Sequence, residues 1–415
     1  MQLVKTEEKK LADYVSFLEK ETIQELNYFA KLMKGKKVAM VNATSFGGGV
    51  AEKLHSMVPL MQDLGLEVDW WTIYGEEKFY QVTKSFHNCL QGQQGVLKED
   101  DKSIYLDYNC LNASYLKNWN YDFVVIHDPQ PAALLEFYEK KESEKWIWRC
   151  HIDTSCPNMS YWNFLYQFIK KYDASIFTME EYVPQDCYSL PNVAFIAPSI
   201  DPLSAKNKTM KMDEAKHILK HLNINVEKPL ITQISRFDPW KDPLGVIDAY
   251  KKAKEVIPDL QLALVGSMAT DDPEGWGYLF KTLRKAGEDH DIKVIVNTGD
   301  REVAALQTAS DILLQKSLRE GFGLTVAEGL WKGTPVIGGN VGGIRLQIEN
   351  GITGYLVNSV EECADKIVTL LQNPDLMKKM SLAGREKVRK EFLITRNILD
   401  YLRLFYRLAI TGKPS

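Results

Sequence analysis

Apolar and polar residues along the chain predict an alternation of strands and helices. Short, nearly continuous apolar runs, such as residues 38–43 and 260–266, are separated by stretches in which apolar residues recur at helical spacing. A strand that is buried on both faces is apolar along its whole length, so this pattern is typical of parallel sheets covered by helices on both faces. We therefore expect an α/β protein.

The alternation occurs twice, on either side of a polar, lysine-rich stretch near residues 202–227. The expected strands of the first series are residues 38–43, 67–73, 122–128, 145–153, 174–180 and 193–201. Those of the second series are residues 229–237, 260–266, 293–299, 311–317, 334–340 and 354–357. We predict two Rossmann-like, doubly wound domains, residues 1–202 and 203–393, that face each other across a cleft where ligands bind.

The two ends of the chain predict helices. Apolar residues recur at helical spacing within the first 35 residues. Residues 394–410 form an amphipathic pattern, and we expect residues 394–415 to pack back against the first domain. The apolar face of this last helix consists of Leu399, Leu402, Phe405 and Leu408.

Composition excludes several classes of protein. Lys plus Arg number 51 against 55 Asp plus Glu, so the net charge of -4 gives no basis for binding nucleic acid or anionic membrane. No apolar run reaches the ~18 residues that a membrane helix needs, and no signal core follows the N-terminus, so we expect a cytoplasmic protein. The 6 cysteines are scattered, which predicts reduced structural thiols, and no metal-ligand cluster is present.

The most informative segment is SLREGFGLTVAEGLWKGTPVIGGNVGG, which begins at Ser317. A predicted strand leads into a glycine-containing turn and then a helix, and free amides at a helix start bind phosphate. Glu320 and Glu328 bracket the turn, so one carboxylate can lie beside the group attached to the phosphates while the other reaches a ribose diol. The candidate binding residues of the turn for such a phosphate-bearing ligand are Gly321, Phe322, Gly323, Leu324 and Thr325.

A cationic pair follows the first predicted strand of the second domain. Arg236 and Lys241 lie in ISRFDPWKDP, between a buried strand and a helix. Fixed cations stabilise negative charge that develops during a reaction, and arginine adds a two-pronged contact. An isolated pair of this kind is usually a solvated surface feature, but this position favours a functional role.

The first domain has a glycine-rich turn of its own, SFGGGVAEKL, with Gly47, Gly48 and Gly49 between a strand and a helix. The glycine spacing does not meet the dinucleotide fingerprint, and no acidic residue ends the second strand, because Asp69 lies inside it. NAD is therefore not expected as a cofactor.

Two strand ends in the first domain carry histidine and aspartate. WRCHIDTS contains His151 and Asp153, and IHDPQP contains His127 and Asp128. Histidines in such positions are often structural. Their place at strand ends, where parallel sheets bind ligands, nevertheless makes His127, His151 and Asp153 candidate site residues.

The string EGFGLTVAE, with two glutamates separated by seven residues, resembles the signature of the retaining glycosyltransferases of family four, which have the GT-B fold. The resemblance covers nearly the whole chain. It implies that Glu320 contacts the transferred hexose, Glu328 the ribose hydroxyls, and Arg236 and Lys241 the donor diphosphate. It also implies that Gly48 and Gly49 lie beside the donor phosphates and the acceptor. His151 is then a candidate catalytic residue that contacts the donor sugar near its primary hydroxyl, and His127 and Asp153 are candidates for binding the acceptor.

Within that family, NATSFGGGVAEKLHSMVPLMQDLG, HDPQP, WRCHIDTS, SRFDPWKDP and PLSAKN resemble trehalose synthases of the glycosyltransferring type. This implies transfer of glucose from ADP-, UDP- or GDP-glucose to free glucose, with retention of configuration, by a cytoplasmic enzyme for which we expect a homodimer. No tightly bound cofactor is implied, and Mg2+ enters only as a stimulant that could accompany the nucleotide. The alternatives are a trehalose phosphorylase, another family-four glucosyltransferase such as a sucrose synthase, a nucleotide-sugar epimerase, and a sugar-binding protein without catalysis.

Overall fold

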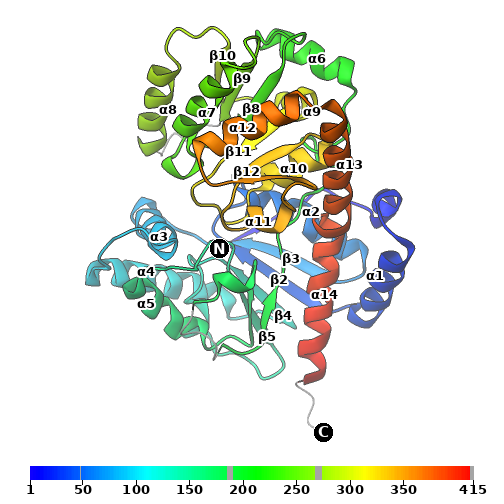
Figure 1. Ribbon diagram of the computed structural model, residues 1–415. Helices are drawn as coiled ribbons and strands as arrows, with labels where there is room; N and C mark the ends of the chain where they lie inside the picture. The colour runs from blue at the N-terminus through cyan, green and yellow to red at the C-terminus, as the bar shows by residue number, and fades with distance from the viewer. Residues whose placement is uncertain (47, 185–189, 267–272, 412–415) are drawn as a thin grey trace. The chain divides into compact units, whose positions relative to one another are not determined.

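The computed structural model describes residues 1–46, 48–184, 190–266 and 273–411, which are coloured along the chain in Figure 1. The chain divides into two compact units. Unit 1 contains Met1–Ser199 and Ile394–Ser415, and unit 2 contains Ile200–Leu393. The polypeptide therefore leaves unit 1, completes unit 2, and returns to unit 1 for its last helix.

Unit 1 contains a seven-stranded sheet in the order β1-β3-β2-β4-β5-β6-β7. Its strands are β1 (Gln2–Val4), β2 (Lys37–Asn42), β3 (Glu67–Thr72), β4 (Phe123–His127), β5 (Lys145–Arg149), β6 (Ala174–Phe177) and β7 (Val193–Phe195). All neighbouring strands are parallel except β1, which pairs with β3 in the antiparallel sense.

The prediction that the first 35 residues are helical is wrong at their beginning. Gln2–Val4 is an edge strand, with Gln2 opposite Thr72, and Leu11–Phe17 is a 3-10 helix, η1. Only Lys20–Met33 forms an α-helix, α1. A strand of 3 residues is too short to show a period of two, and its hydrogen-bond partners come from β3, about 70 residues away.

The other helices of unit 1 lie between its strands or at the C-terminus. They are α2 (Gly49–Asp63), α3 (Glu77–Leu90), α4 (Glu99–Ala113), α5 (Met159–Ile169), α14 (Ile394–Thr411), and the 3-10 turns η2 (Ser114–Leu116), η3 (Leu134–Phe137) and η4 (Glu180–Tyr182).

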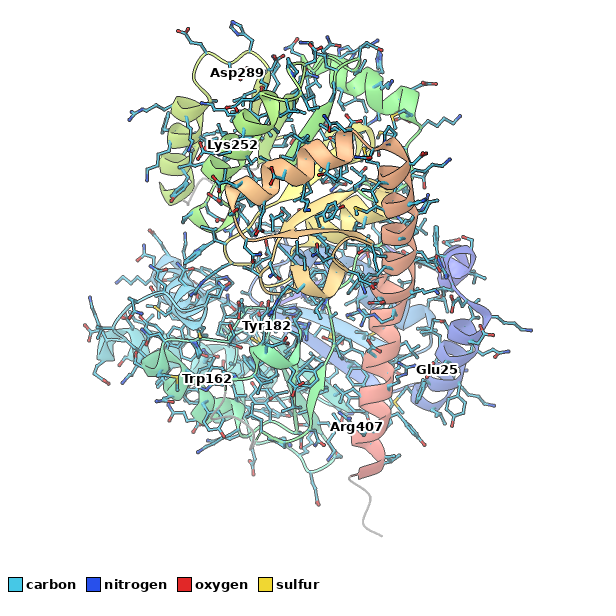
Figure 2. All side chains as sticks on the ribbon, in the orientation of Figure 1. Glu25, Trp162, Tyr182, Lys252, Asp289 and Arg407 are labelled. Atoms are coloured by element: carbon cyan, nitrogen blue, oxygen red, sulfur yellow. The ribbon has the colours of Figure 1, made fainter. Side chains whose placement is uncertain are left out.

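Helix α14 packs against α1 and α2 of unit 1 (Figure 1, red). The residues expected on its apolar face are all buried: Leu399, Leu402, Phe405 and Leu408. The Phe405 ring stacks on Phe123 of β4 at a centroid distance of 4.5 Å. An Arg403 nitrogen lies 2.6 Å from a carboxylate oxygen of Glu25 on α1, which is labelled in Figure 2.

Unit 2 contains a six-stranded, all-parallel sheet in the order β10-β9-β8-β11-β12-β13. Its strands are β8 (Leu230–Ile234), β9 (Gln261–Gly266), β10 (Ile292–Val296), β11 (Ile312–Gln315), β12 (Val336–Gly339) and β13 (Gly354–Val357). Its helices are α6 (Met212–His221), the 3-10 turn η6 (Pro239–Lys241), α7 (Pro243–Lys254), α8 (Pro273–Ala286), α9 (Asp300–Ala309), α10 (Leu324–Lys332), α11 (Ile344–Gln347), α12 (Val360–Leu371) and α13 (Pro374–Glu391).

Strand β9 shows why the apolar runs are continuous. Leu262 and Leu264 belong to a core that also contains residues of α7, α8 and α12, whereas Ala263 and Val265 pack with residues of α6 and α9. Successive side chains of a strand point to opposite faces, so both faces of this strand are covered by helices. The predicted α/β architecture with buried parallel strands is confirmed.

Each sheet contains a point at which the strand order reverses. In unit 1 the chain builds outward from β2 to β3 and then starts again at β4 on the other side of β2. In unit 2 it runs from β8 to β9 and β10, and then starts again at β11. Open parallel sheets bind ligands outside the carboxyl ends of the strands at such switch points. The loops after β2 and β4, and those after β8 and β11, are therefore the expected ligand-binding loops.

Candidate functional site

In unit 2 the loops that follow β8 and β11 are tied to each other. The Leu318 amide donates a hydrogen bond of 2.7 Å to the Trp240 carbonyl. The Arg319 guanidinium lies 5.0 Å from the centroid of the Trp240 ring. Gln233 on β8 donates from Nε2 to the Lys241 carbonyl at 2.6 Å. Two segments about 80 residues apart thus form one local structure at the switch point.

The structure brings Lys241 and Glu320 together. Lys241 Nζ lies 2.5 Å from Glu320 Oε2, and the two side chains are only 17% and 10% exposed. The same oxygen accepts from Gln315 Nε2 at 3.1 Å and from Ser317 Oγ at 3.2 Å. A shielded ion pair held by further hydrogen bonds keeps its geometry without reorganisation, as a group that stabilises a transition state requires.

Arg236 lies on the same loop but does not join this pair. Its side chain is 67% exposed, and Nη2 lies 3.5 Å from Asp238 Oδ2. Asp238 caps η6 by accepting from the Lys241 amide at 3.0 Å. The loop therefore presents one cation in a shielded ion pair, Lys241, and one largely exposed cation, Arg236.

The predicted phosphate-binding turn leads directly into α10. Gly323 has a φ of 80° and is the N-cap residue, so α10 begins at Leu324 as expected. Thr325 Oγ1 donates to the Ile234 carbonyl of β8 at 3.2 Å. The first amides of a helix have no intrahelical acceptor and attract anions.

The residues after β12 support this turn from behind. Gln347 Nε2 donates to the Phe322 carbonyl at 2.5 Å. A Cβ atom on Gly343 would lie only 2.6 Å from the Gly321 carbonyl oxygen, so the two backbones could not approach as closely with a side chain there. The Phe322 side chain is buried, with its ring 5.6 Å from that of Phe392, so only its backbone remains for a ligand.

Glu328 on α10 is more deeply buried than Glu320 and has different partners. Lys206 Nζ lies 2.6 Å from Glu328 Oε1, and Gln307 Nε2 donates to Oε2 at 2.7 Å. Sequence reasoning did not single out Lys206 or Gln307. The string PLSAKN, which contains Lys206, was the available signal, but it gave no indication of which side chain it would meet.

In unit 1 the glycine-rich turn after β2 leads into α2. Gly48 has a φ of 87° and precedes Gly49, the first residue of the helix. A Cβ atom built on Gly48 would meet no atom within 4 Å, so the turn is open on that side, and the glycine is required by its backbone conformation. Gly47 lies outside the described residues.

The two candidate histidines of unit 1 contact each other. His127 Nδ1 lies 2.9 Å from His151 Nε2, and the rings are stacked with an interplanar angle of 15°. Burial lowers the pKa of both imidazoles well below the usual range, and the charges of Lys53 and Arg149 lower it further. Both rings are therefore neutral near pH 7, and one donates a hydrogen bond to the other.

The two aspartates play different parts. Asp128 has a φ of 66°, and its Oδ1 accepts from the His151 amide at 2.9 Å, which fixes the backbone beside the imidazole. Burial raises the pKa of Asp128 to about 6. Asp153 accepts from the Ser155 amide and hydroxyl, at 3.0 Å and 2.6 Å. The structure thus joins His127, His151 and Asp128, while Asp153 shapes the turn that follows.

The neutral histidine pair predicts a pH dependence of stability. A base whose pKa is lowered by folding gives stability that is complete above its unfolded pKa of about 6.5 and is lost as the pH falls below it. Between about pH 6 and pH 5, replacing His127 with Gln should reduce the slope of the unfolding free energy against pH by about 1.4 kcal/mol per pH unit. Urea unfolding at several pH values measures the slope.

The matched control is His55→Gln, which changes an exposed histidine of the same unit. Asp128 changes the stability in the opposite direction, because its raised pKa lets the folded chain take up a proton before the unfolded chain as the pH falls. Asp128 is present in every variant compared, so its contribution does not affect the comparison. An unchanged slope in His127→Gln would show that the imidazole pair does not titrate as described.

Three further observations concern membrane spans, metal ligands and cysteines among the described residues. No helix in the parts of the chain that the structure describes is long and apolar enough to cross a membrane. No group of three or more His, Cys, Asp or Glu among those residues could hold a metal ion. The described cysteines are free thiols, and Cys187 lies outside the described residues.

Comparison with known proteins places this site in a family. Residues 40–184 match the family model "Trehalose synthase, N-terminal domain", and residues 214–387 match "Glycosyl transferases group 1". Trehalose synthase of Pyrococcus horikoshii is 50% identical over 97% of both chains, and that of Rubrobacter xylanophilus is 47% identical over 98% of this chain and 99% of its own. Trehalose phosphorylase of Pleurotus pulmonarius is 29% identical over 92% of this chain and 59% of its own.

Solved structures agree on the fold. Sucrose-phosphate synthase from Thermosynechococcus elongatus has a TM-score of 0.72 over 91% of this chain and 100% of its own, at 16% identity. Anabaena Alr3699/HepE in complex with UDP-glucose has a TM-score of 0.66 over 90% of this chain and 98% of its own, at 15% identity. The predicted GT-B class, with two Rossmann-like parallel-sheet units, is confirmed.

Proposed function

The chain belongs to the trehalose synthase family of glycosyltransferases, and on that premise we propose that it transfers glucose from a nucleoside-diphosphate glucose to free glucose. The products are α,α-trehalose and the nucleoside diphosphate. The observation that carries this proposal is the shielded Lys241–Glu320 pair at the switch point of unit 2, next to the first amides of α10.

The donor side of the reaction needs groups that bind a sugar and a diphosphate together. A carboxylate suits the hydroxyls of a hexose, because it accepts hydrogen bonds only. The ammonium of Lys241, the exposed guanidinium of Arg236 and the start of α10 suit the phosphates. These groups lie at the carboxyl ends of neighbouring strands, so unit 2 is the proposed donor unit.

The acceptor side is assigned to unit 1. His127 and His151 follow β4 and β5, and Gly48 and Gly49 follow β2, at the switch point of its sheet. A neutral imidazole has one donor and one acceptor nitrogen, which suits sugar hydroxyls, and His151 is the proposed contact to the donor glucose. Asp153 remains a proposed acceptor contact.

For the chemical step we propose front-face attack with retention of configuration. The bond from the anomeric carbon to the phosphate oxygen breaks and a bond to the acceptor oxygen forms on the same face. The leaving phosphate oxygen takes the acceptor proton. Charge accumulates on the diphosphate as the bond breaks, so Lys241 and Arg236 contribute most in the transition state.

Product analysis tests the function directly. Purified protein is incubated with ADP-, UDP- or GDP-glucose, with and without free glucose, and the sugars are separated by chromatography. Trehalose that forms only when both donor and glucose are present is the expected result. Glu320→Gln, which keeps the size of the side chain but removes the charge that pairs with Lys241, should abolish most of it.

The other outcomes separate the alternatives. Donor consumption with another acceptor, but not with glucose, would keep the glycosyltransferase and discard trehalose as its product. Trehalose cleavage that requires inorganic phosphate and no nucleotide would identify a phosphorylase, which the trehalose phosphorylase of Pleurotus pulmonarius makes the leading alternative. A change of the donor sugar without any acceptor would indicate an epimerase.

A further inference from the structure

Lys206, which lies outside the loops that follow β8 and β11, forms an ion pair with Glu328, the second glutamate of the EGFGLTVAE segment. Lys206 Nζ lies 2.6 Å from Glu328 Oε1, and the two side chains are 17% and 3% exposed. Gln307 on α9 donates to the other oxygen, Oε2, at 2.7 Å. The carboxylate is thus fixed from two sides, by groups 122 and 21 residues away in the sequence.

The backbone around Lys206 is attached to the same helix. Trp331 on α10 donates from Nε1 to the Asn207 carbonyl at 3.2 Å, and Lys332 donates from Nζ to the Lys208 carbonyl. Asn207 is fully buried. The segment that carries Lys206 therefore lies against α10 through its main chain, so the position of the ammonium does not depend on the Glu328 contact alone.

The second cation nearby does not replace Lys206. Lys332 lies one turn after Glu328, and burial lowers the pKa of its ammonium to about 8. Its Nζ hydrogen-bonds to the Lys208 carbonyl and so faces the segment that carries Lys206. Lys206 is the cation that forms an ion pair with the Glu328 carboxylate.

The contacts with Lys206 and Gln307 do not fill every hydrogen-bond acceptor position of the Glu328 carboxylate. A carboxylate can accept about four hydrogen bonds, about two on each oxygen. Gln307 takes one position on Oε2, while Lys206 forms an ion pair with the buried Oε1. One acceptor position on Oε2 remains, which suits a hydroxyl of a ribose.

We propose that Lys206 is a positioning residue of the donor site, which fixes the Glu328 carboxylate so that the remaining acceptor position on Oε2 binds a ribose hydroxyl of the nucleotide. The proposal rests on the proposed nucleotide-sugar donor. Without Lys206 the carboxylate would be a buried charge held by the amide of Gln307, and an incompletely compensated buried charge is costly. The expected consequence is a donor site that no longer distinguishes a ribose from a deoxyribose.

The test measures nucleotide affinity by calorimetry in the full-length protein. The probe is whichever of ADP, UDP and GDP the wild type binds most tightly, together with its 2′-deoxy analogue. The wild type should bind the deoxy analogue about tenfold more weakly, because the lost hydrogen bond is to a charged group. Lys206→Met should weaken binding of the ribonucleotide about tenfold and bring the two affinities within about threefold of each other.

Lys208→Met is the matched control. Lys208 lies two residues away, its side chain is exposed, and its main-chain carbonyl accepts a hydrogen bond from Lys332 on α10. It should retain the tenfold preference for ribose. Lys206→Arg keeps the charge and should recover part of that preference, which a loss of local packing alone would not predict.

The outcomes separate this proposal from the proposed function. If the wild type binds none of the three diphosphates, the proposed function fails and the role of Lys206 fails with it. If the wild type prefers ribose and Lys206→Met keeps that preference, only the role of Lys206 is overturned.

A second comparison covers the case in which Lys206→Met does not fold. The double variant Lys206→Met/Glu328→Gln removes both charges from the buried pair and is compared with Glu328→Gln alone. If the double variant binds each nucleotide as tightly as Glu328→Gln does, Lys206 acts through Glu328. A further loss of affinity in the double variant overturns it.

Discussion

Replacing Lys241 with methionine is expected to lower kcat by about two to three orders of magnitude, while the KM for the nucleotide sugar changes by less than about threefold. The ammonium is already fixed 2.5 Å from Glu320, in a site shielded from solvent. Its attraction for the diphosphate grows as the glycosidic bond breaks, so its removal costs more in the transition state than in the bound state. Steady-state kinetics with the preferred donor measure both parameters.

The control for this variant is Lys252→Met. Lys252 is on α7 of the same unit, is labelled in Figure 2, and pairs at the surface with Glu361 at 3.4 Å. An exposed ion pair contributes little, so activity should be unchanged. Thermal unfolding of both variants shows whether each remains folded at the assay temperature. Equal factors of loss in kcat and in donor affinity for Lys241→Met would contradict a role in the transition state.

Replacing Phe405 with alanine is expected to lower the free energy of unfolding of unit 1 by about 3–5 kcal/mol. The ring is fully buried and stacks on Phe123 of the central strand β4. The substitution removes this contact and leaves a cavity between α14 and the sheet, and a closely packed core does not collapse to fill such a space. Urea unfolding followed by circular dichroism measures the change.

Ile410→Ala is the control for the same helix, because Ile410 is exposed near the end of α14. Its effect should stay within about 0.5 kcal/mol. If the two variants were equally stable, the apolar face of α14 would not contribute to unit 1 in solution. A loss confined to Phe405→Ala would show that the C-terminal helix is part of the core of this unit.

The fold could be predicted where a segment carries its own signal. Strand β9 is apolar throughout because both of its faces are buried, and the apolar residues of α12 recur at helical spacing, so each element shows its own period in the sequence. Strand β1 could not be predicted in this way. Its place at the edge of the sheet is determined by pairing with β3, which lies about 70 residues away.

The candidate site follows the same rule. The turn from Glu320 to α10 is local in sequence, so its glycines, helix start and glutamates are enough to indicate a ligand site. The partners of Glu328 could not be found from the sequence, since Lys206 lies 122 residues before it and only the folding of unit 2 brings them together. The stacked pair of His127 and His151 likewise depends on the pairing of β4 with β5.

The insertion of unit 2 within the sequence of unit 1 has a consequence for the order of synthesis. The first and last residues of unit 2 lie side by side, because Ile200 pairs with Leu393 and its amide donates to the Phe392 carbonyl at 2.8 Å. Unit 2 is therefore complete on the ribosome once Leu393 has emerged, while unit 1 still lacks the helix that carries Phe405. Although its strands are made first, unit 1 finishes folding last, so a nascent chain cut short near its C-terminus contains a complete unit 2 and an unfinished unit 1.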